Sequence, residues 1–132
     1  MAQSPFEKVA PGVFVVRYQT DEELLPDRQA ALLAAVRAER GGAAIVFVLA
    51  PDVWKVDLSV PQFWAHAVAD PALPLRAIAV VSGSVAVRAA THTFRIATML
   101  RKQPLAVASL DEEGAAVHWA RNILRAPAPA SP

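Results

Sequence analysis

The chain has 132 residues, with 13 Lys and Arg against 12 Asp and Glu and no cysteine. This length suits one domain that buries about two-thirds of its unfolded surface. A net charge of +1 argues against general affinity for nucleic acid or anionic membranes, and the lack of cysteine excludes disulfides, thiolate nucleophiles and cysteine-ligated zinc.

The N-terminal half predicts a lead-in, a strand, a helix and a second strand, in that order. Residues 1–11 form the lead-in, and the sequence leaves open whether a short strand at residues 6–9 joins the sheet. Residues 13–18 alternate in part between apolar and polar side chains, as a half-buried strand does. A helix follows over residues 27–40 and ends at two glycines, with an apolar face formed by Ala31, Leu32, Ala35 and Val36. Residues 45–49 are a continuous apolar run, typical of a parallel strand covered on both faces.

The C-terminal half continues the alternation of helices and strands. Ser59 and Pro61 suit the start of a helix over residues 60–69, and residues 77–81 form the next buried strand. A long helix is predicted over residues 85–101, with one apolar face formed by Ala86, Ala90, Thr93, Phe94, Ala97 and Leu100. A strand at 105–108 and a helix from a capping box at 109–112 to about 124 follow, and residues 126–132 predict a disordered tail rich in alanine and proline.

This order predicts one α/β domain over residues 12–125. We expect a small, mostly parallel or mixed sheet of four or five strands, packed with about four helices. Because such sheets collect functional residues in the loops after the carboxyl ends of their strands, those loops are where a site is expected.

The loop before the helix at 60–69 holds the first candidates. A phosphate on Ser59, beside Asp57, would be stabilised by the amides and dipole of a helix N-terminus. The alternative is that Ser59 caps the helix and Asp57 solvates the loop. Trp54, in the same loop, is either an exposed contact for a partner or part of the core.

The long helix carries a basic surface, which is the second candidate. Arg88, His92 and Arg95 recur at helical spacing, with Arg101 and Lys102 beyond them. They predict docking of an acidic partner or a phosphorylated ligand, or simply a solvated helix surface.

The turn before that helix is a possible anion site. Ser82, Gly83 and Ser84 follow a buried strand, and Arg88 lies one turn into the helix. Backbone amides there could hold a phosphate or carboxylate, while the alternative is an ordinary turn in which Ser84 caps the helix.

No motif predicts catalysis, a metal or a cofactor. His66, His92 and His118 fall on three separate helices without ligand spacing. A nucleophile elbow, a carboxylate pair and a glycine-rich dinucleotide fingerprint are all missing from the sequence, so we expect a protein that is not an enzyme.

The element order and the loop Val56-Asp57-Leu58-Ser59-Val60 resemble the STAS domain, the fold of bacterial anti-sigma factor antagonists and of sulfate-transporter tails. In that family a loop of apolar-Asp-Ser-Ser-Gly type opens the helix. Asp57 falls on the family's aspartate, Leu58 on the serine or threonine that partner kinases phosphorylate, Ser59 on the next position, and Val60 replaces the glycine. The chain also resembles bacterial STAS-like proteins related in fold to lipid-carrying Sec14-type domains, in which the switch serine is not fixed.

The resemblance implies a cytoplasmic, non-catalytic regulatory module that binds another protein, such as a regulatory kinase or signalling partner in an anti-sigma-type pathway. The contact surface would comprise the loop at 52–59, the helix at 60–69 and the basic helix. Two alternatives stay open. One is a small-ligand or lipid-binding module, with Arg88 or Arg95 at an anionic head group and an apolar pocket lined by Val53, Trp54, Phe63, Trp64 and Phe94. The other is a self-associating scaffold protein.

Two further expectations come from the same sequence. The longest apolar stretch, residues 43–51, is too short to cross a bilayer, which needs about 20 residues. The N-terminus has no secretory signal pattern, and these two features underlie the expected cytoplasmic location.

Overall fold

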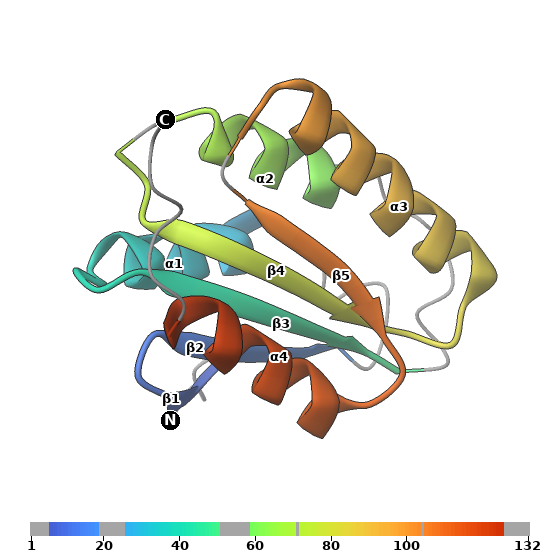
Figure 1. Ribbon diagram of the computed structural model, residues 1–132, viewed down its shortest axis with the longest axis horizontal. Coiled ribbons are helices and arrows are strands. Elements are labelled where there is room, and N and C mark those ends of the chain that lie inside the picture. The colour runs from blue at the N-terminus through green and yellow to red at the C-terminus, as the bar shows by residue number, and fades with distance from the viewer. Residues whose placement is uncertain (1–5, 19–25, 51–58, 71, 104, 126–132) are drawn as a thin grey trace.

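The computed structural model describes residues 6–18, 26–50, 59–70, 72–103 and 105–125, of which 26–28 and 59–61 are described by their backbone alone. These residues form five strands and four helices and confirm the predicted α/β class (Figure 1). In chain order the elements are β1 (Glu7–Ala10), β2 (Val13–Tyr18), α1 (Pro26–Arg37), β3 (Ala43–Leu49), α2 (Ser59–Val68), β4 (Leu75–Val81), α3 (Val85–Leu100), β5 (Ala106–Leu110) and α4 (Glu113–Arg125). The tail predicted at 126–132 lies outside the described residues.

The strands lie in the sheet in the order in which they occur along the chain, from β1 to β5. β1 pairs with β2 in antiparallel fashion, and every later pair is parallel. Each parallel connection crosses to the next strand in the same direction, and right-handed crossovers then place their helices on one face. Figure 1 shows the result, with α4 in front of the sheet and α1 behind it.

The face that carries α1, α2 and α3 has a core of large side chains. Trp64 of α2 is 2% exposed, and its ring centroid lies 6.1 Å from that of Phe47 on β3. The other buried residues of this core come from β2, α1, β3, α2, β4 and the turn before β4: Phe14, Val16, Tyr18, Leu32, Val36, Ala43, Ile45, Ala67, Leu73, Leu75 and Ile78. Phe94 of α3 packs against its margin.

The opposite face has a core of small side chains. Of the described helices, α4 alone covers it, through buried Ala116 and Ala120. The sheet meets them with Ala44, Ala77 and Ala79 among its buried residues. Because alanine extends no further than Cβ, the helix can lie close to the strands. The alternation of alanine with larger residues in β4 therefore reflects its two faces. One lets α4 pack close to the sheet, and the other fills the core beneath α1, α2 and α3 with large side chains.

The segment expected as a lead-in contributes a strand. β1 pairs through Glu7 with Val15 and through Lys8 with Phe14, so the strand that the sequence left open does join the sheet. The capping box expected at 109–112 is wrong, since Ser109 pairs with Val80 inside β5 and α4 begins only at Glu113. Pairing with β4 extends the strand over two residues that local pattern assigns to a helix cap.

The apolar face predicted for the long helix is also wrong in part. The buried residues of α3 are Val87, Thr91 and Thr98, whereas Leu100 is 79% exposed. The threonines can be buried because the Thr91 hydroxyl donates to the Val87 carbonyl at 2.9 Å and the Thr98 hydroxyl to the Arg95 carbonyl at 2.8 Å. With their hydroxyls satisfied within the helix, both side chains can be buried without a polar partner from another element. The helix is thereby rotated relative to the predicted orientation.

Candidate functional site

The outer surface of α3 carries large apolar side chains, which the sequence did not predict. Val85 is 82% exposed, Ile96 43%, Met99 64% and Leu100 79%. Apart from Val9 in β1, these are all the exposed large hydrophobic residues in the described part of the chain. We call Val85, Ile96, Met99 and Leu100, with exposed Ala89 and His92 between them, the α3 stripe. Large apolar side chains exposed along one face of a helix make that face a candidate interaction site.

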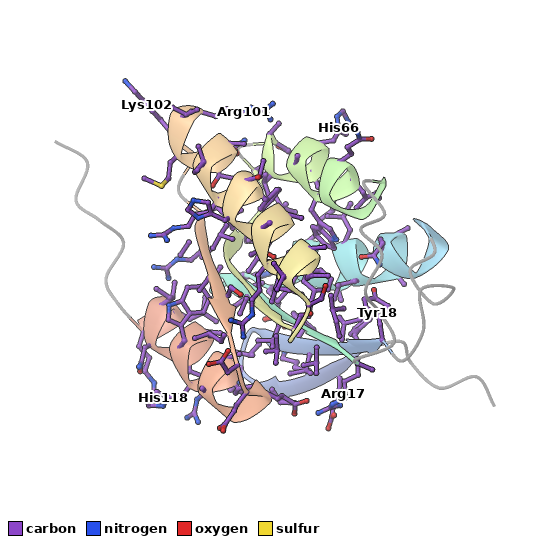
Figure 2. All side chains as sticks on the ribbon, turned by 90° about the vertical axis from the view of Figure 1, so that its right-hand side faces the viewer. Arg17, Tyr18, His66, Arg101, Lys102 and His118 are labelled. Atoms are coloured by element: carbon purple, nitrogen blue, oxygen red, sulfur yellow. The ribbon has the colours of Figure 1, made fainter. Side chains whose placement is uncertain are left out.

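Cationic side chains border the α3 stripe. Arg95, Arg101 and Lys102 are exposed, and no carboxylate in the described residues pairs with them. Figure 2 shows Arg101 and Lys102 at the end of α3, directed away from the body of the molecule. The sequence from residue 71 to 110 contains five Lys and Arg and neither Asp nor Glu. The predicted basic residues are therefore at the surface, where His92 lies within the α3 stripe and the cationic side chains lie beside it.

The Arg88 side chain binds acceptors within the protein itself. Its Nε donates to the Ser82 carbonyl at 2.9 Å, and its guanidinium forms an ion pair with Asp111. The side chain thus joins the turn between β4 and α3 to the turn between β5 and α4, both at the carboxyl edge of the parallel strands. Arg88 belongs to this edge more than to the α3 stripe.

Two amides at the predicted anion site have partners within the turn. The Ser84 amide donates to the Ser82 hydroxyl at 3.0 Å, and the Val87 amide donates to the Ser84 hydroxyl at 3.3 Å. Ser84 therefore caps α3. Gly83 is exposed between the two serines. Anion binding at Ser82, Gly83, Ser84 and Arg88 stays a prediction, and it would require these bonds to be exchanged for bonds to the ligand.

A charge cluster that the sequence did not predict lies at the same carboxyl edge. Arg17 of β2 donates from Nε to Glu113 Oε1 at 2.8 Å and from Nη2 to Glu113 Oε2 at 2.7 Å, and from Nη1 to Glu7 at 2.9 Å. The residue thus links β1, β2 and the first turn of α4. One signal was present, since Arg17 interrupts an otherwise apolar strand. The Arg17 hydrogen bonds hold the pKa of the Glu113 carboxyl below its ordinary value of 4.5.

Glu113→Gln is expected to make the protein less stable at neutral pH but to leave it little changed in acid. Because the Glu113 pKa is lower in the folded chain, the pair stabilises the fold above the ordinary pKa and this contribution is lost as pH falls through the folded value. Both side chains are more than a third exposed, so solvent screening limits the loss at pH 7 to about 1 kcal/mol or less. Urea unfolding at pH 7 and at pH 3 measures it. Glu112→Gln, which removes the same charge one residue away, is the control, and equal losses in both variants would contradict the assignment.

A buried polar network was missed as well. The Trp64 indole N–H donates to Gln29 Oε1 at 2.9 Å, and the Gln29 amide donates to the Tyr18 hydroxyl. All three side chains are fully buried. They join α2, α1 and the carboxyl end of β2. The signal lay in the spacing of Gln29, Leu32 and Val36, which places the glutamine on the buried face of α1.

The predicted switch loop is not part of the described structure. Trp54 and Asp57 lie outside the described residues. Ser59 is the first residue of α2, which agrees with the helix start predicted there, but its side chain is not described. The switch and contact roles of these three residues stay predictions.

The histidines are exposed on three helices, His66 on α2, His92 on α3 and His118 on α4. Figure 2 shows His66 and His118 on opposite sides of the molecule. Within the described residues, no three His, Asp or Glu side chains come together in a group that could hold a metal ion. Among the helices that are described, none has the length and apolar character needed to cross a membrane.

Comparison with known proteins found no matching family model, no matching curated protein and no matching solved structure. The resemblance to STAS domains therefore stays a prediction.

Proposed function

We propose that this protein is a non-catalytic, STAS-like regulatory module that binds another protein, and that α3 forms the contact surface. The observation that carries the proposal is the exposed α3 stripe. Leaving Val85, Met99 and Leu100 largely in water forgoes about 1.5–3 kcal/mol for each side chain that could be buried. A partner that covers the stripe recovers this free energy.

The packing of the aromatic residues favours a protein partner over a ligand in the core. Phe63 and Trp64 lie 5.3 Å apart, ring centroid to ring centroid, and Phe94 packs against the same core. These side chains were expected to line a pocket in the ligand-binding alternative. Trp64 contacts both Phe63 and Phe47, as side chains do in a packed core.

The rigid attachment of α3 also supports a docking role. Its buried face is anchored by Val87, Thr91 and Thr98, its start is capped by Ser84, and Arg88 ties its first turn to Asp111. A surface that is held in place before binding loses little conformational entropy when a partner docks. The phosphorylation switch expected at Ser59 is a separate element of the proposal.

Site-specific cross-linking in the cell of origin tests the proposal. A photoreactive amino acid at position 96 or 99 is expected to capture a second, different protein, while the same group at exposed position 122 of α4 is not. Capture at position 122 with equal yield would mean that the contact is not specific to α3. Adducts with the chain itself would favour the self-associating scaffold, and adducts with lipid alone would favour the ligand-binding alternative.

A further inference from the structure

We infer that the partner of α3 is an acidic amphipathic helix, which lies along the α3 stripe and places Asp or Glu side chains beside Arg95, Arg101 and Lys102. This inference rests on the proposed function and names the chemistry of the partner at that surface.

The spacing of the α3 stripe is that of a helix–helix seam. Val85, Ala89, His92, Ile96 and Met99 follow one another at intervals of four, three, four and three residues. This is the repeat with which one helix packs along another, each large side chain fitting between residues of the facing helix. The small side chain at Ala89 leaves room for a large one from the partner. With a length of about 24 Å, the 16 residues of α3 offer more than four turns to such a partner.

The charge around the stripe selects an acidic partner. Arg95, Arg101 and Lys102 have no carboxylate partner among the described residues, and residues 71–110 contain no acid that could supply one locally. A helix with acidic flanks would form charge-assisted bonds to these cations at the edge of the apolar contact. Such pairs at an interface contribute chiefly to partner choice and association rate.

The same charges disfavour a second copy of this chain as the partner. In an antiparallel pair of α3 helices, Arg101 and Lys102 would lie near the N-terminus of the opposite helix, which carries the positive end of the dipole and has no acid in its first turn. In a parallel pair they would face their own copies. Both arrangements bring like charges together.

A membrane surface also fits less well than a helix. Helices that lie in the membrane interface commonly insert Trp or Phe together with a broad apolar face. The aromatic residue of α3, Phe94, packs against the protein core instead. The exposed apolar residues form a narrow stripe with Arg95 at its side.

The backbone of Lys102 gives independent support for a binding role at this end of α3. Its φ is 56°, in the left-handed region, and the amides of Lys102 and Gln103 close the helix by donating to the carbonyls of Met99 and Thr98, both at 3.0 Å. Glycine is the usual residue at this position because a Cβ is strained there. A lysine that tolerates this backbone strain at an exposed helix end is explained if its charge binds carboxylates of a partner.

A displayed library of helices tests the inference. Every member has apolar residues at the a and d positions of three heptads, with Asp, Glu, Lys, Arg or Gln randomised at the flanking positions. Selection on the full-length protein is expected to enrich Asp and Glu at the flanks. An enriched peptide should bind Ile96→Gln/Leu100→Gln at least 10-fold more weakly, and should bind the α4 surface control Ala115→Gln as it binds the wild type.

Lys102→Gly separates binding from folding. It should raise the midpoint of thermal unfolding by about 2–4 °C, because it relieves the backbone, and yet weaken binding of the enriched peptide about 3-fold. A variant that is more stable and binds equally well would overturn the role of Lys102.

Three other outcomes would overturn the inference. The first is a selection that enriches neutral or basic flanks, or that enriches nothing. The second is binding of the wild-type protein to phosphatidylserine vesicles that is lost in Ile96→Gln/Leu100→Gln. The third is sedimentation of the wild-type protein as a dimer that the same double substitution dissociates. Cross-linking of a different protein at position 96 together with a failed selection would refute the acidic helix alone. Failure of both experiments would refute the proposed function as well.

Discussion

Replacing Trp64 with alanine is expected to lower the free energy of unfolding by about 3–5 kcal/mol. The side chain is 2% exposed and packs against Phe47 and Phe63, so its removal leaves a large cavity. It also leaves Gln29 Oε1, which accepts the indole N–H, buried without that donor. Urea unfolding followed by circular dichroism measures the loss.

Trp64→Phe divides this loss into its two parts. The phenyl ring retains most of the buried volume but cannot donate to Gln29, so we expect a loss of about 1–3 kcal/mol from the unsatisfied amide oxygen. Gln62→Ala, at an exposed position two residues earlier on α2, is the control and should change stability by less than about 0.5 kcal/mol. If Trp64→Ala cost no more than this control, the buried network would not hold α2 to the sheet.

Replacing Gly12 with alanine is the second substitution with a large expected effect. Gly12 joins β1 to β2 with φ at +78°, and a Cβ there would lie 2.5 Å from the Gly42 carbonyl oxygen. Neither backbone can move freely, because the Ala44 amide donates to the Gly12 carbonyl at 2.8 Å where β2 and β3 begin to pair. Strain in φ and the close contact together should lower the free energy of unfolding by about 2–4 kcal/mol.

Gly41→Ala is the matched control for this substitution. A Cβ at Gly41 would meet nothing within 4 Å, and its φ is not in the left-handed region. The same change of one methyl group, in the turn next to Gly42, should therefore leave stability within about 0.5 kcal/mol of the wild type or raise it slightly. Equal thermal unfolding midpoints for the two variants would show that the turn at Gly12 relaxes.

Of the candidate site, only the exposed basic residues could be predicted from the sequence. The sequence indicated that Arg88, His92 and Arg95 would be at the surface of a helix, and all three are exposed. It could not indicate that Arg88 would pair with Asp111, since the two residues meet only because β4 and β5 are neighbours. The apolar character of the outer face escaped prediction for a different reason, which lies in the two threonines of α3.

Threonine is ambiguous to any reading of hydrophobic pattern. The predicted apolar face accepts Thr93 but leaves out Thr91 and Thr98, and this choice turns the buried face of α3 towards Phe94 and Leu100. In the folded protein their hydroxyls bond within the helix and both side chains are buried, so Leu100 is left outside. The pattern of residue types does not show which group accepts a hydrogen bond from a threonine hydroxyl.

Local sequence patterns were sufficient to predict the α/β class, the alternation of helices and strands from residue 13 onwards, and the strands at the centre of the sheet. Continuous apolar runs such as that of β3 can be satisfied only by burial on both faces, and glycine, proline and capping residues end elements locally. Four features became visible only in the folded protein: the joining of β1, the extension of β5 through Ser109, the Arg17–Glu113 pair and the side of α3 that faces water. Each of these depends on a neighbour far away in the chain, and the free energy of such contacts outweighs local preference.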